Sequence, residues 1–494
     1  MRICIVAEGC YPYVVGGVAS WIHNMLNSFP EHEFILLTIV ASRSQRGKFV
    51  YELPDNVIEV REMYLSDNEW DEKQEMGRNE GKSDNKRMGK RMRKEEFNAL
   101  KNLIMNEDTG WDVLFNMFQR KHFSVDQILM GMDFLKAVKE SYRKYHSDMV
   151  FSNYLWTMRS IYLPLFLVMR YKVPKADLYH CVATGYAGIL GAKAKYLYNC
   201  GLLISEHGIY TREREEEMIK AKWVQGIYKN IWIDQFKKMS QLAYDRADVV
   251  TSLYSYARKL QVELGAPVDK LMITPNGIRT ENFADIPGKL PEDEGYTNIG
   301  AVLRVAPIKD VKTLIRAFYY AKKKEPSLRL YIMGSYDEEP EYAKECFDMV
   351  DSMEIEDCIF TGRVNVREYL GRMDCTILTS ISEGQPLTIL EGYAAHKPCI
   401  ATDVGNCRGL IYGEDDDFGE AGILTHIMNI DELSSAMVEM AQNVGRRNRM
   451  GEAGYNRVMA KYKNEHMIER YARLYDAFEN GIITDNETSG RESA

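Results

Sequence analysis

Short runs of apolar residues alternate with longer segments of mixed apolar and polar residues along most of the chain. The short runs are typical of buried strands, and the longer segments have the spacing of amphipathic helices. Strands are predicted at 2–8, 33–40, 178–183, 202–208, 248–253 and 271–278, and then at 298–305, 328–334, 358–362, 375–380 and 398–402. Helices are predicted at 311–324, 386–396 and near 464–480. This alternation favours an α/β protein made of two Rossmann-like, doubly wound domains.

Two segments interrupt the alternation. Residues 279–298 are rich in Pro, Gly and acidic residues and are predicted to be a domain linker. Residues 66–146 are polar and lack clear strands, which predicts a helical insertion. Its basic stretch at 82–94 is either a solvated loop or a docking surface for an anionic partner or membrane. We therefore expect an N-terminal domain over 1–285, a C-terminal domain over 286–462, and a segment 463–494 whose helix crosses back before a polar tail.

Composition narrows the class of protein. The chain has 494 residues, a net charge of −9 and nine scattered cysteines without a CxxC pair. The negative charge argues against a nucleic-acid-binding protein, and the cysteines indicate reduced thiols rather than disulfides or a zinc site. The start MRICIVAEG reads as a strand rather than a signal peptide. The apolar stretch at 161–169 is shorter than the roughly 20 residues of a spanning helix. We expect a cytoplasmic protein, with peripheral association at the inner face of the membrane left open.

The stretch SEGQPLTILEG places Glu383 in a loop after a buried strand and Glu391 in the second turn of the helix that follows. Pro386 suits a helix start. Free N–H groups there, together with the Thr388 hydroxyl, can bind phosphate oxygens. The Glu383 carboxylate can accept hydrogen bonds from sugar hydroxyls, and Glu391 can reach a ribose diol. The alternative is a charge that interacts with the helix dipole, which explains Glu383 but leaves Glu391 unexplained.

Three further groups lie at predicted strand ends. Arg304 and Lys309 can hold a diphosphate, although a plain surface pair is the alternative. Gly16 and Gly17 precede the first helix and let a ligand approach its backbone, or form a tight turn. Their spacing is not GxGxxG, so a nicotinamide dinucleotide fold is poorly supported. His207 follows a strand and is equally consistent with a packed side chain and a catalytic one.

At these residues the chain resembles the retaining glycosyltransferases of family 4, which have the GT-B fold, over about 1–60 and 150–480. The resemblance implies that Arg304 and Lys309 hold the donor diphosphate, that Glu383 and His207 contact the donor sugar, and that Glu391 holds the ribose. The matching motif residues, and hence the remaining expected donor-binding residues, are Gly16, Gly17, Asn276, Gly384, Gln385, Pro386, Leu387 and Thr388. Two positions depart from the family pattern, namely Gly392 in place of Ala and His396 in place of Gly.

The resemblance also implies that 1–285 is the acceptor-side domain and 286–462 the nucleotide-sugar-binding domain, and it implies a reaction and its partners. The stretches EGCYPYVVGGVASWIHNML, SEHGIYTRERE and TDVGNCRGLI are similar to members that act in exopolysaccharide synthesis. They imply a UDP-hexose donor, with UDP-glucose expected, a carbohydrate acceptor and a membrane polysaccharide-synthesis complex. Because both glutamates are assigned to hydroxyl binding, we expect same-face attack in which the leaving diphosphate accepts the proton. The candidate loops contain no DxD pair, and 415–417 is expected to be a surface loop, so no metal or cofactor is predicted. The alternatives are a glycogen- or sucrose-synthase-like transferase and a catalytically silent UDP-sugar-binding subunit.

Overall fold

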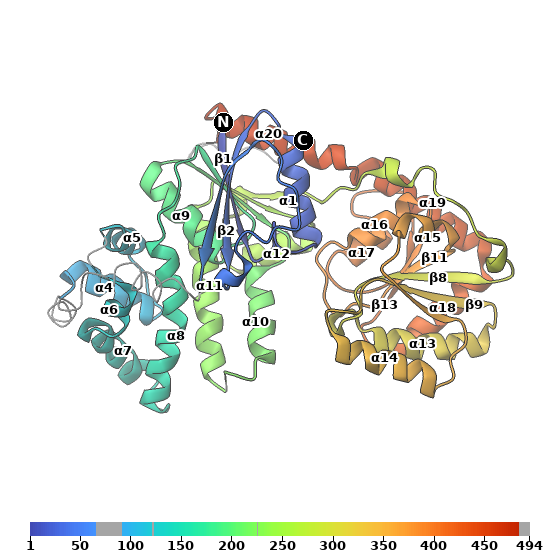
Figure 1. Ribbon diagram of the computed structural model, residues 1–494, viewed down its shortest axis with the longest axis horizontal. Helices are drawn as coiled ribbons and strands as arrows, with labels where there is room; N and C mark the ends of the chain where they lie inside the picture. Colours follow the sequence, from blue (N-terminus) through green and yellow to red (C-terminus); the bar gives the residue numbers. More distant parts are fainter. Residues whose placement is uncertain (66–90, 121–122, 225, 484–494) are drawn as a thin grey trace. The chain divides into compact units, whose positions relative to one another are not determined.

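The computed structural model of the chain describes residues 1–65, 91–120, 123–224 and 226–483, which form two compact units (Figure 1). Unit 1 comprises Met1–Ser252, Arg258–Met272 and the chain from Leu474 onward. Unit 2 comprises Leu253–Ala257 and Ile273–Arg473. The segment 279–298, predicted to be a linker, therefore belongs to unit 2.

Unit 1 contains a sheet in the order β3-β2-β1-β4-β5-β6-β7, in which β1 to β6 pair in parallel. Its strands are β1 (Arg2–Glu8), β2 (Glu33–Val40), β3 (Val57–Tyr64), β4 (Leu178–Cys181), β5 (Gly201–Glu206), β6 (Val249–Ser252) and β7 (Leu271–Ile273). Helices are α1 (Gly17–Ser28), α4 (Lys94–Ile104), α5 (Trp111–Gln119), α6 (Val125–Leu129), α7 (Met132–Tyr145), α8 (Phe151–Arg170), α9 (Tyr186–Tyr198), α10 (Tyr210–Lys220), α11 (Tyr228–Arg246) and α12 (Ser255–Glu263).

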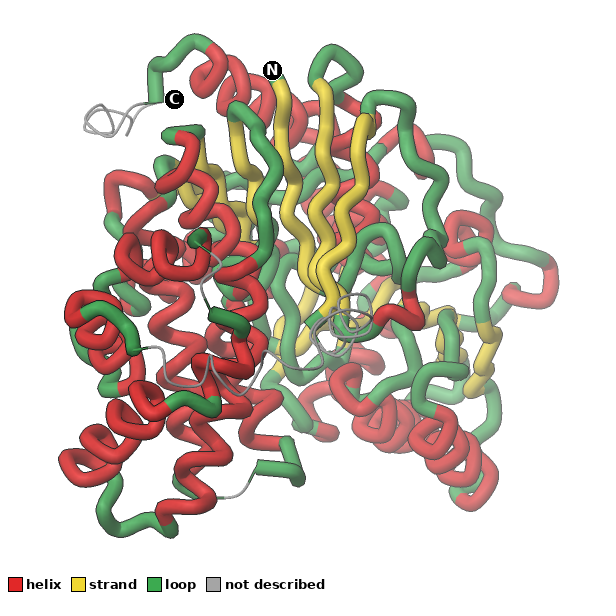
Figure 2. The backbone as a smooth tube through the Cα atoms, turned by 60° about the vertical axis from the view of Figure 1, so that its left-hand side comes forward, coloured by secondary structure: helices red, strands yellow, loops and turns green. Residues whose placement is uncertain are grey.

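The insertion shares the hydrophobic core of unit 1. Phe115 of α5 and Phe134 of α7 are fully buried in the same cluster as Cys4 of β1 and Ile35 of β2. The described part of the insertion is helical, as predicted, and Figure 2 shows its helices gathered beside the strands. Residues 82–90 of the basic stretch lie outside the described residues. Among the described helices, none is both long enough and apolar enough to cross a bilayer.

Unit 2 contains a parallel sheet in the order β10-β9-β8-β11-β12-β13. Its strands are β8 (Thr297–Val302), β9 (Leu328–Met333), β10 (Cys358–Gly362), β11 (Cys375–Leu378), β12 (Cys399–Thr402) and β13 (Gly422–Thr425). Helices are α13 (Val311–Lys324), α14 (Pro340–Ser352), α15 (Val366–Arg372), α16 (Leu387–Ala394), α17 (Cys407–Tyr412), α18 (Ile430–Gln442), α19 (Val444–Lys461) and α20 (Asn464–Glu479). The predicted fold class, two doubly wound Rossmann-like domains, is confirmed.

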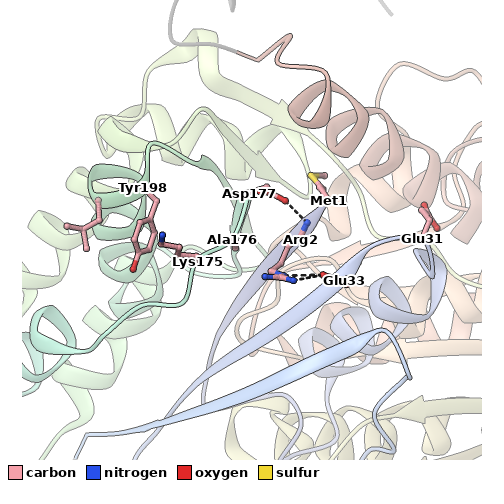
Figure 3. Close-up of a pocket in the computed structure, with 9 residues that line it drawn as sticks. Met1, Arg2, Glu31, Glu33, Lys175, Ala176, Asp177 and Tyr198 are labelled. Atoms are coloured by element: carbon pink, nitrogen blue, oxygen red, sulfur yellow. Dashed lines mark hydrogen bonds and ion pairs between the residues drawn. The ribbon is translucent and has the colours of Figure 1, made fainter.

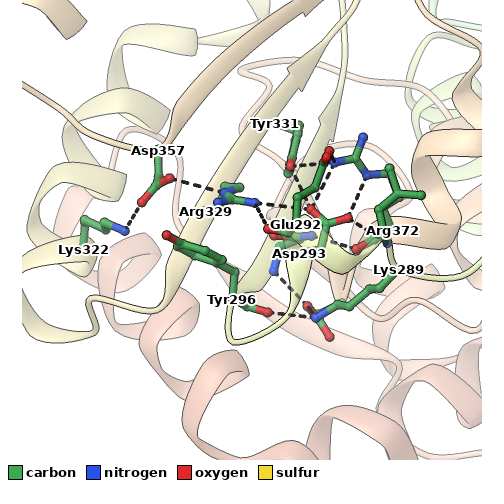
Figure 4. A network of polar contacts seen from close by, with 12 residues as sticks. Lys289, Glu292, Asp293, Tyr296, Lys322, Arg329, Tyr331, Asp357 and Arg372 are labelled. Atoms are coloured by element: carbon green, nitrogen blue, oxygen red, sulfur yellow. Dashed lines mark hydrogen bonds and ion pairs between the residues drawn. The ribbon is translucent and has the colours of Figure 1, made fainter.

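A network of charged side chains fastens the segment before β8 to unit 2 (Figure 4). The Asp293 carboxylate is fully buried and accepts hydrogen bonds from the Arg372 guanidinium at 2.8 and 3.1 Å and from the Tyr331 hydroxyl at 3.0 Å. Burial alone would raise the pKa of Asp293, but the Arg372 hydrogen bonds and the Leu290 N–H bring it below the ordinary value. The Pro- and Gly-rich segment is thereby held in place on unit 2.

The last helix, α20, begins in unit 2, and its residues from Leu474 onward belong to unit 1. In unit 1 the hydroxyl of Tyr475 lies 2.8 Å from Nδ1 of the buried His180. The ring of Tyr475 also packs edge-on against Phe29, with ring centroids 5.0 Å apart. The end of the helix is therefore part of the unit 1 core.

Candidate active site

The loops that carry the predicted residues of unit 2 meet at one point of its sheet. From β8 the chain first adds β9 and β10 on one side of the sheet and then β11, β12 and β13 on the other side. The strand order therefore reverses between β8 and β11. Ligands of doubly wound sheets bind at the carboxyl ends of the strands at such a reversal. The Ile381 N–H donates to the Ile308 carbonyl at 2.9 Å, and the Thr379 hydroxyl donates to the Lys309 carbonyl at 2.9 Å. The loops after β8 and β11 are thus joined through their backbones.

This junction brings Lys309 and Glu383 together. The Lys309 Nζ lies 2.5 Å from Glu383 Oε1, and the Ser380 hydroxyl donates to the same oxygen at 2.5 Å. The two charged side chains are only 19% and 14% exposed. Two residues predicted separately from the sequence, 74 positions apart, therefore form one partly desolvated ion pair at the sheet's crevice.

Arg304 lies in the loop after β8 but has a different partner. Its guanidinium pairs with the Glu338 carboxylate at 2.5 Å, and the two side chains are 57% and 48% exposed. Gly334 packs directly against the backbone of this loop, because a Cβ atom at that position would lie only 1.8 Å from the Leu303 carbonyl oxygen. Arg304 is consequently a solvent-exposed cation whose side chain can change partners at little cost.

The loop from Glu383 to Pro386 is braced from a second side. Gly405 has a positive φ of +53°, and a Cβ there would lie 2.3 Å from the carbonyl oxygens of Glu383 and Gly384. The Asn406 N–H donates to the Gly384 carbonyl at 2.9 Å. Pro386 is the N-cap residue of α16, and its side chain cannot accept hydrogen bonds from the first N–H groups of the helix. The N–H groups of Leu387 and Thr388 are thus available to an anion.

Gln385 and Asn276 form a buried polar pair beside this loop. The Asn276 N–H donates to Gln385 Oε1 at 2.8 Å, and the residues are 9% and 7% exposed. Within the described part of the chain, Asn276 Oδ1 and Gln385 Nε2 are buried and have no hydrogen-bond partner. Buried polar atoms are nearly always paired, so these two are suited to a polar ligand.

Glu391 lies in the second turn of α16, as the sequence predicted. Burial raises the pKa of its carboxyl group to about 7, and the Arg367 guanidinium opposes the shift. Near neutral pH the group therefore exists in both protonation states. Hydroxyl groups that donate to the carboxylate would stabilise its ionised form.

His207 follows β5 in unit 1. Its ring packs against Trp21 of α1, with ring centroids 4.4 Å apart, and burial lowers its pKa to about 4. Its Nε2 atom is buried and lacks a hydrogen-bond partner among the described residues. The preceding Glu206 points into the unit, where it accepts hydrogen bonds from Tyr244 and Gln261 at 2.6 and 2.9 Å. His207 is thus neutral at physiological pH and can exchange hydrogen bonds without carrying a charge.

Gly16 and Gly17 lie where β1 passes into α1. Gly16 is extended, with φ −176° and ψ 173°, and is the N-cap residue of α1. A Cβ added at either glycine would meet no heavy atom within 4 Å. Neither packing nor a left-handed backbone within unit 1 demands glycine at these positions, and ligand approach stays a prediction.

Sequence reasoning missed several charged or polar groups at these strand ends. Glu8 ends β1, accepts a hydrogen bond from the Ala187 N–H at 2.6 Å, and has a pKa raised by burial. Ser380 and Glu338, the partners of Glu383 and Arg304, were also missed. For Glu8 the signal was present, since it is a carboxylate directly after an apolar strand. The two partners carry no such signal because they are defined by loops that meet only in the folded chain.

The segment 415–417 is a surface loop, as expected, because Asp415 and Asp417 are exposed, but the side chain of Asp416 turns inward. Its side chain is 5% exposed and pairs at 2.8 Å with Arg457, which is fully buried. The segment therefore contains a structural ion pair. Within the described ranges, no group of three His, Cys, Asp or Glu side chains comes together in the way a metal ion requires. Independence from metal stays a prediction.

The position where the family pattern has glycine, His396, is left-handed, with φ +55°. Its ring stacks on Tyr455, with centroids 3.8 Å apart, and its Nδ1 lies 3.1 Å from a Glu452 oxygen. These contacts offset the strain of a non-glycine residue after α16. The departure from the family pattern does not prevent the C-terminal turn of the helix.

A cavity of about 820 Å³ lies at the opposite, amino-terminal edge of the unit 1 sheet (Figure 3). Two of its carboxylates, those of Glu33 and Asp177, are already bound by Arg2. Arg2 contacts Glu33 at 2.8 Å, and the Arg2 N–H donates to Asp177 at 2.7 Å. The cavity is at the wrong end of the strands for a doubly wound site, and none of the predicted residues lines it.

Comparisons with known proteins place the chain in a family. Residues 1–269 match the family described as "Domain of unknown function (DUF3492)", and residues 282–457 match "Glycosyl transferases group 1". The chain belongs to the DUF3492 family. Its second unit carries a group 1 glycosyltransferase domain, which contains Arg304, Lys309, Glu383 and Glu391. The predicted glycosyltransferase class is confirmed at this level.

Curated relatives are glycosyltransferases by name. The chain is 26% identical over 211 residues to "Putative glycosyltransferase EpsD" of Bacillus subtilis, a match that covers 41% of this chain and 53% of the relative. It is 25% identical over 293 residues to "UDP-Gal:alpha-D-GlcNAc-diphosphoundecaprenol alpha-1,3-galactosyltransferase" of Escherichia coli, covering 56% of this chain and 70% of that protein. The chain spans about half the length of the first curated relatives that it matches.

Solved structures agree on the fold. The Anabaena protein Alr3699/HepE, solved in complex with UDP and glucose, superposes with a TM-score of 0.57. The sequences are 13% identical, and the match covers 96% of this chain and 99% of that one. The likeness confirms the GT-B fold that the resemblance implied.

Proposed function

We propose that the protein is a retaining glycosyltransferase that transfers a hexose, with glucose expected, from a UDP-sugar to a hydroxyl group of a carbohydrate acceptor. The observation that carries the proposal is the Lys309–Glu383 ion pair beside the uncapped start of α16. The cation and the helix N–H groups suit a diphosphate, and the carboxylate suits sugar hydroxyls. The group 1 match and a solved neighbour containing UDP and glucose support this choice of donor.

The donor nucleotide is assigned to the α16 side of the crevice. Glu391 accepts hydrogen bonds from the two ribose hydroxyls, while the N–H groups of Leu387 and Thr388 bind phosphate oxygens. The unpaired Gln385 Nε2 and Asn276 Oδ1 are a donor and an acceptor for the ligand. These assignments use the buried polar atoms that the fold itself leaves without partners.

Catalysis rests on stabilising the charge of the departing diphosphate. Lys309 is already fixed at the crevice by Glu383, so little reorganisation is needed when charge develops. Arg304 must leave Glu338, and its exposed position makes that exchange inexpensive. The two cations would act most strongly in the transition state, where the glycosidic bond is breaking.

The state of the two carboxylates favours same-face attack over a mechanism with a carboxylate nucleophile. In glycosidases one carboxylate acts as nucleophile and the other as acid, on either side of the scissile bond. Here Glu383 Oε1 already accepts from both Lys309 and Ser380, and Glu391 is assigned to the ribose. We infer that the acceptor attacks from the face that the diphosphate leaves, and that the diphosphate oxygen takes the acceptor's proton.

Three residues of unit 1 take the roles that the family resemblance implies for them. His207 is neutral, so we assign it a hydrogen bond to a donor-sugar hydroxyl rather than a proton transfer. Gly16 and Gly17 let the donor approach the start of α1. For Asn276 and the glycines the role is positioning, because none of them can exchange a proton near neutral pH.

For the acceptor we propose a growing exopolysaccharide made by a membrane complex, with the enzyme on the cytoplasmic side. The motifs quoted from the sequence are similar to those of PelF, the Pel exopolysaccharide glycosyltransferase. The Escherichia coli relative, whose name describes transfer from UDP-Gal to a diphosphoundecaprenol-linked sugar, supports an acceptor at a membrane.

A panel of nucleotide sugars tests the proposal. Binding is measured by calorimetry, and release of the nucleoside diphosphate is measured with UDP-glucose, UDP-galactose, UDP-N-acetylglucosamine, ADP-glucose and GDP-mannose. Glu391→Ala should weaken UDP by roughly 1.5–3 kcal/mol, whereas Glu383→Ala should leave UDP binding nearly intact and reduce turnover. Glu341→Ala, on the exposed start of α14, is the matched control. Binding without turnover in the wild type would favour a silent UDP-sugar-binding subunit, and equal loss of UDP affinity in both site variants would contradict the assigned roles.

A further inference from the structure

Large apolar side chains are exposed at one end of unit 1, at the turn between α10 and α11 and at the start of α8. Trp223 is 67% exposed, Ile219 62% and Ile227 47% at the α10–α11 turn. Val150 and Trp156, at the start of α8, are 61% and 60% exposed. Single exposed apolar residues are ordinary, but two tryptophans with three aliphatic neighbours call for an explanation. We name these five residues the tryptophan face.

The two parts of the tryptophan face lie at the same end of unit 1. A cavity of about 360 Å³ is lined by Tyr145, His146 and Met158 from the corner of α7 and α8, and by Ile231 and Asp234 from the start of α11. The start of α8 is therefore next to the start of α11. In Figure 1 the start of α8, the end of α10 and the start of α11 all extend in the same direction, beyond the carboxyl ends of the unit 1 strands.

Contacts within unit 1 fix the positions of the two tryptophan rings and of the turn that carries Trp223. The Lys229 Nζ donates to the Ile219 carbonyl at 2.6 Å and so closes the last turn of α10. Trp223 packs edge-on against Trp232, with ring centroids 5.6 Å apart. Trp156 lies under the Arg159 guanidinium, 5.0 Å from its ring centroid. The exposed rings have a fixed place in the fold and are not frayed ends.

Positive charge accompanies the exposed rings. Residues 218–233 contain Lys220, Lys222 and Lys229 and no Asp or Glu, although the whole chain carries a net charge of −9. Residues 149–176, which include all of α8, contain Arg and Lys residues and likewise no acidic residue. The acidic run 215–217 of α10 comes directly before the first of these segments, and its Glu216 carboxylate lies 3.7 Å from the Lys220 Nζ. The basic character of the α10–α11 turn therefore rests mainly on Lys222 and Lys229.

We propose that the tryptophan face docks the protein on an anionic lipid bilayer, with Trp156 and Trp223 in the headgroup region and the lysines of the α10–α11 turn on the lipid phosphates. Tryptophan and lysine are the residues that favour the membrane–water boundary, and each lysine near an anionic leaflet adds attraction. A protein partner fits less well, because the cores of protein interfaces are poor in lysine and need one continuous patch. The proposal does not depend on the proposed transfer reaction.

Docking of this kind has a consequence for the site. Gly17 and His207 lie at the carboxyl ends of β1 and β5, the same end of unit 1 as the tryptophan face. A bilayer bound there would lie beside the acceptor-side loops. If the proposed function holds, the acceptor is presented from the membrane surface.

Co-sedimentation with vesicles tests the proposal. Wild-type protein should sediment with vesicles of phosphatidylcholine and phosphatidylserine at low salt, and much less with phosphatidylcholine alone or at high salt. The double variant Lys220→Glu/Lys222→Glu should lose at least about fivefold in partitioning for each lysine. Trp156→Ala/Trp223→Ala should lose binding at least about tenfold. Val444→Ser, 50% exposed on α19, and Lys324→Glu/Lys344→Glu, on the surface of unit 2, are the matched controls and should bind as wild type.

Three outcomes would overturn the proposal. The first is wild-type protein that ignores anionic vesicles. The second is a double tryptophan or lysine variant, shown to be folded by its thermal unfolding, that binds them as well as wild type does. The third is a wild-type dimer in light scattering that both face variants convert to monomer without any vesicle binding, which would make a second copy of the chain the occupant. The lysine variant keeps the test decisive if removal of Trp223 disturbs the contact with Trp232.

Discussion

The raised pKa of Glu391 makes donor binding depend on pH, with a sign and size that follow from the structure. Burial raises this pKa from 4.5 to about 7. If the ionised carboxylate is the form that accepts the ribose hydroxyls, only about a tenth of the free protein is competent at pH 6 and about nine tenths at pH 8. The affinity for UDP-glucose should therefore rise roughly tenfold over this range and level off above it.

Isothermal titration calorimetry with UDP-glucose is the assay, because the diphosphate of a nucleotide sugar does not titrate in this range. At pH 7 binding should release about half a proton, seen as a dependence of the apparent enthalpy on buffer ionisation. Glu391→Gln should abolish both effects. Arg367→Ala removes the cation that lowers the pKa, so the midpoint of the affinity profile should move to higher pH.

The same ionisation affects the ligand-free protein in the opposite sense. The folded chain holds the Glu391 proton more tightly than the unfolded chain, so its stability falls as the pH rises from about 4.5 to about 7. Bound donor should offset this loss. A flat affinity profile in the wild type, or an unchanged slope in Glu391→Gln, would refute the ribose assignment.

Three further predictions concern the metal, the cations and the helix end. Activity should survive EDTA, since the charge of the diphosphate is assigned to protein groups; complete loss restored by magnesium or manganese would contradict this. Lys309→Ala should lower kcat by about two to three orders of magnitude, and Arg304→Ala should lower it less because Arg304 is exposed. An unchanged kcat with a raised KM would instead indicate that the cation binds the ground state and the transition state equally. In urea unfolding, His396→Ala should lower the free energy of unfolding by about 1 kcal/mol, because it removes the Tyr455 stacking and keeps the left-handed backbone. His396→Gly should lower it by less, since glycine adopts that backbone without strain. The reverse order would argue against strain at this residue.

Strands of the sheet interiors could be predicted because parallel strands buried on both faces are continuous apolar runs. β1 and β11 are of this kind. The sequence analysis missed β3 and β13, which are edge strands in the described sheets. β3 carries Glu59, Arg61 and Glu62 at half-buried positions, and β13 follows the acidic stretch 413–420, so neither stands out as an apolar run.

The candidate site was accessible to sequence reasoning where position alone decides. Lys309 and Glu383 each follow a strand, and parallel topology brings such loops to one edge. The residues that interact with Glu383, Arg304 and Glu391 could not be predicted. These are Ser380, Glu338 and Arg367, whose positions depend on how separate loops pack in the folded chain. The neutral state of His207 was also inaccessible, since it results from burial against Trp21.

The central claim is that this chain cleaves a UDP-hexose with retention, and proton NMR of the UDP-glucose reaction tests it most directly. Purified wild-type protein is incubated with UDP-glucose, and the anomeric proton of the first released or transferred sugar is followed before mutarotation. The account predicts release of UDP and a product that first appears as the α-anomer, with both signals reduced by about two to three orders of magnitude in Lys309→Ala. Appearance of the β-anomer first would contradict retention, and absence of nucleoside diphosphate release with every nucleotide sugar would contradict the transferase itself.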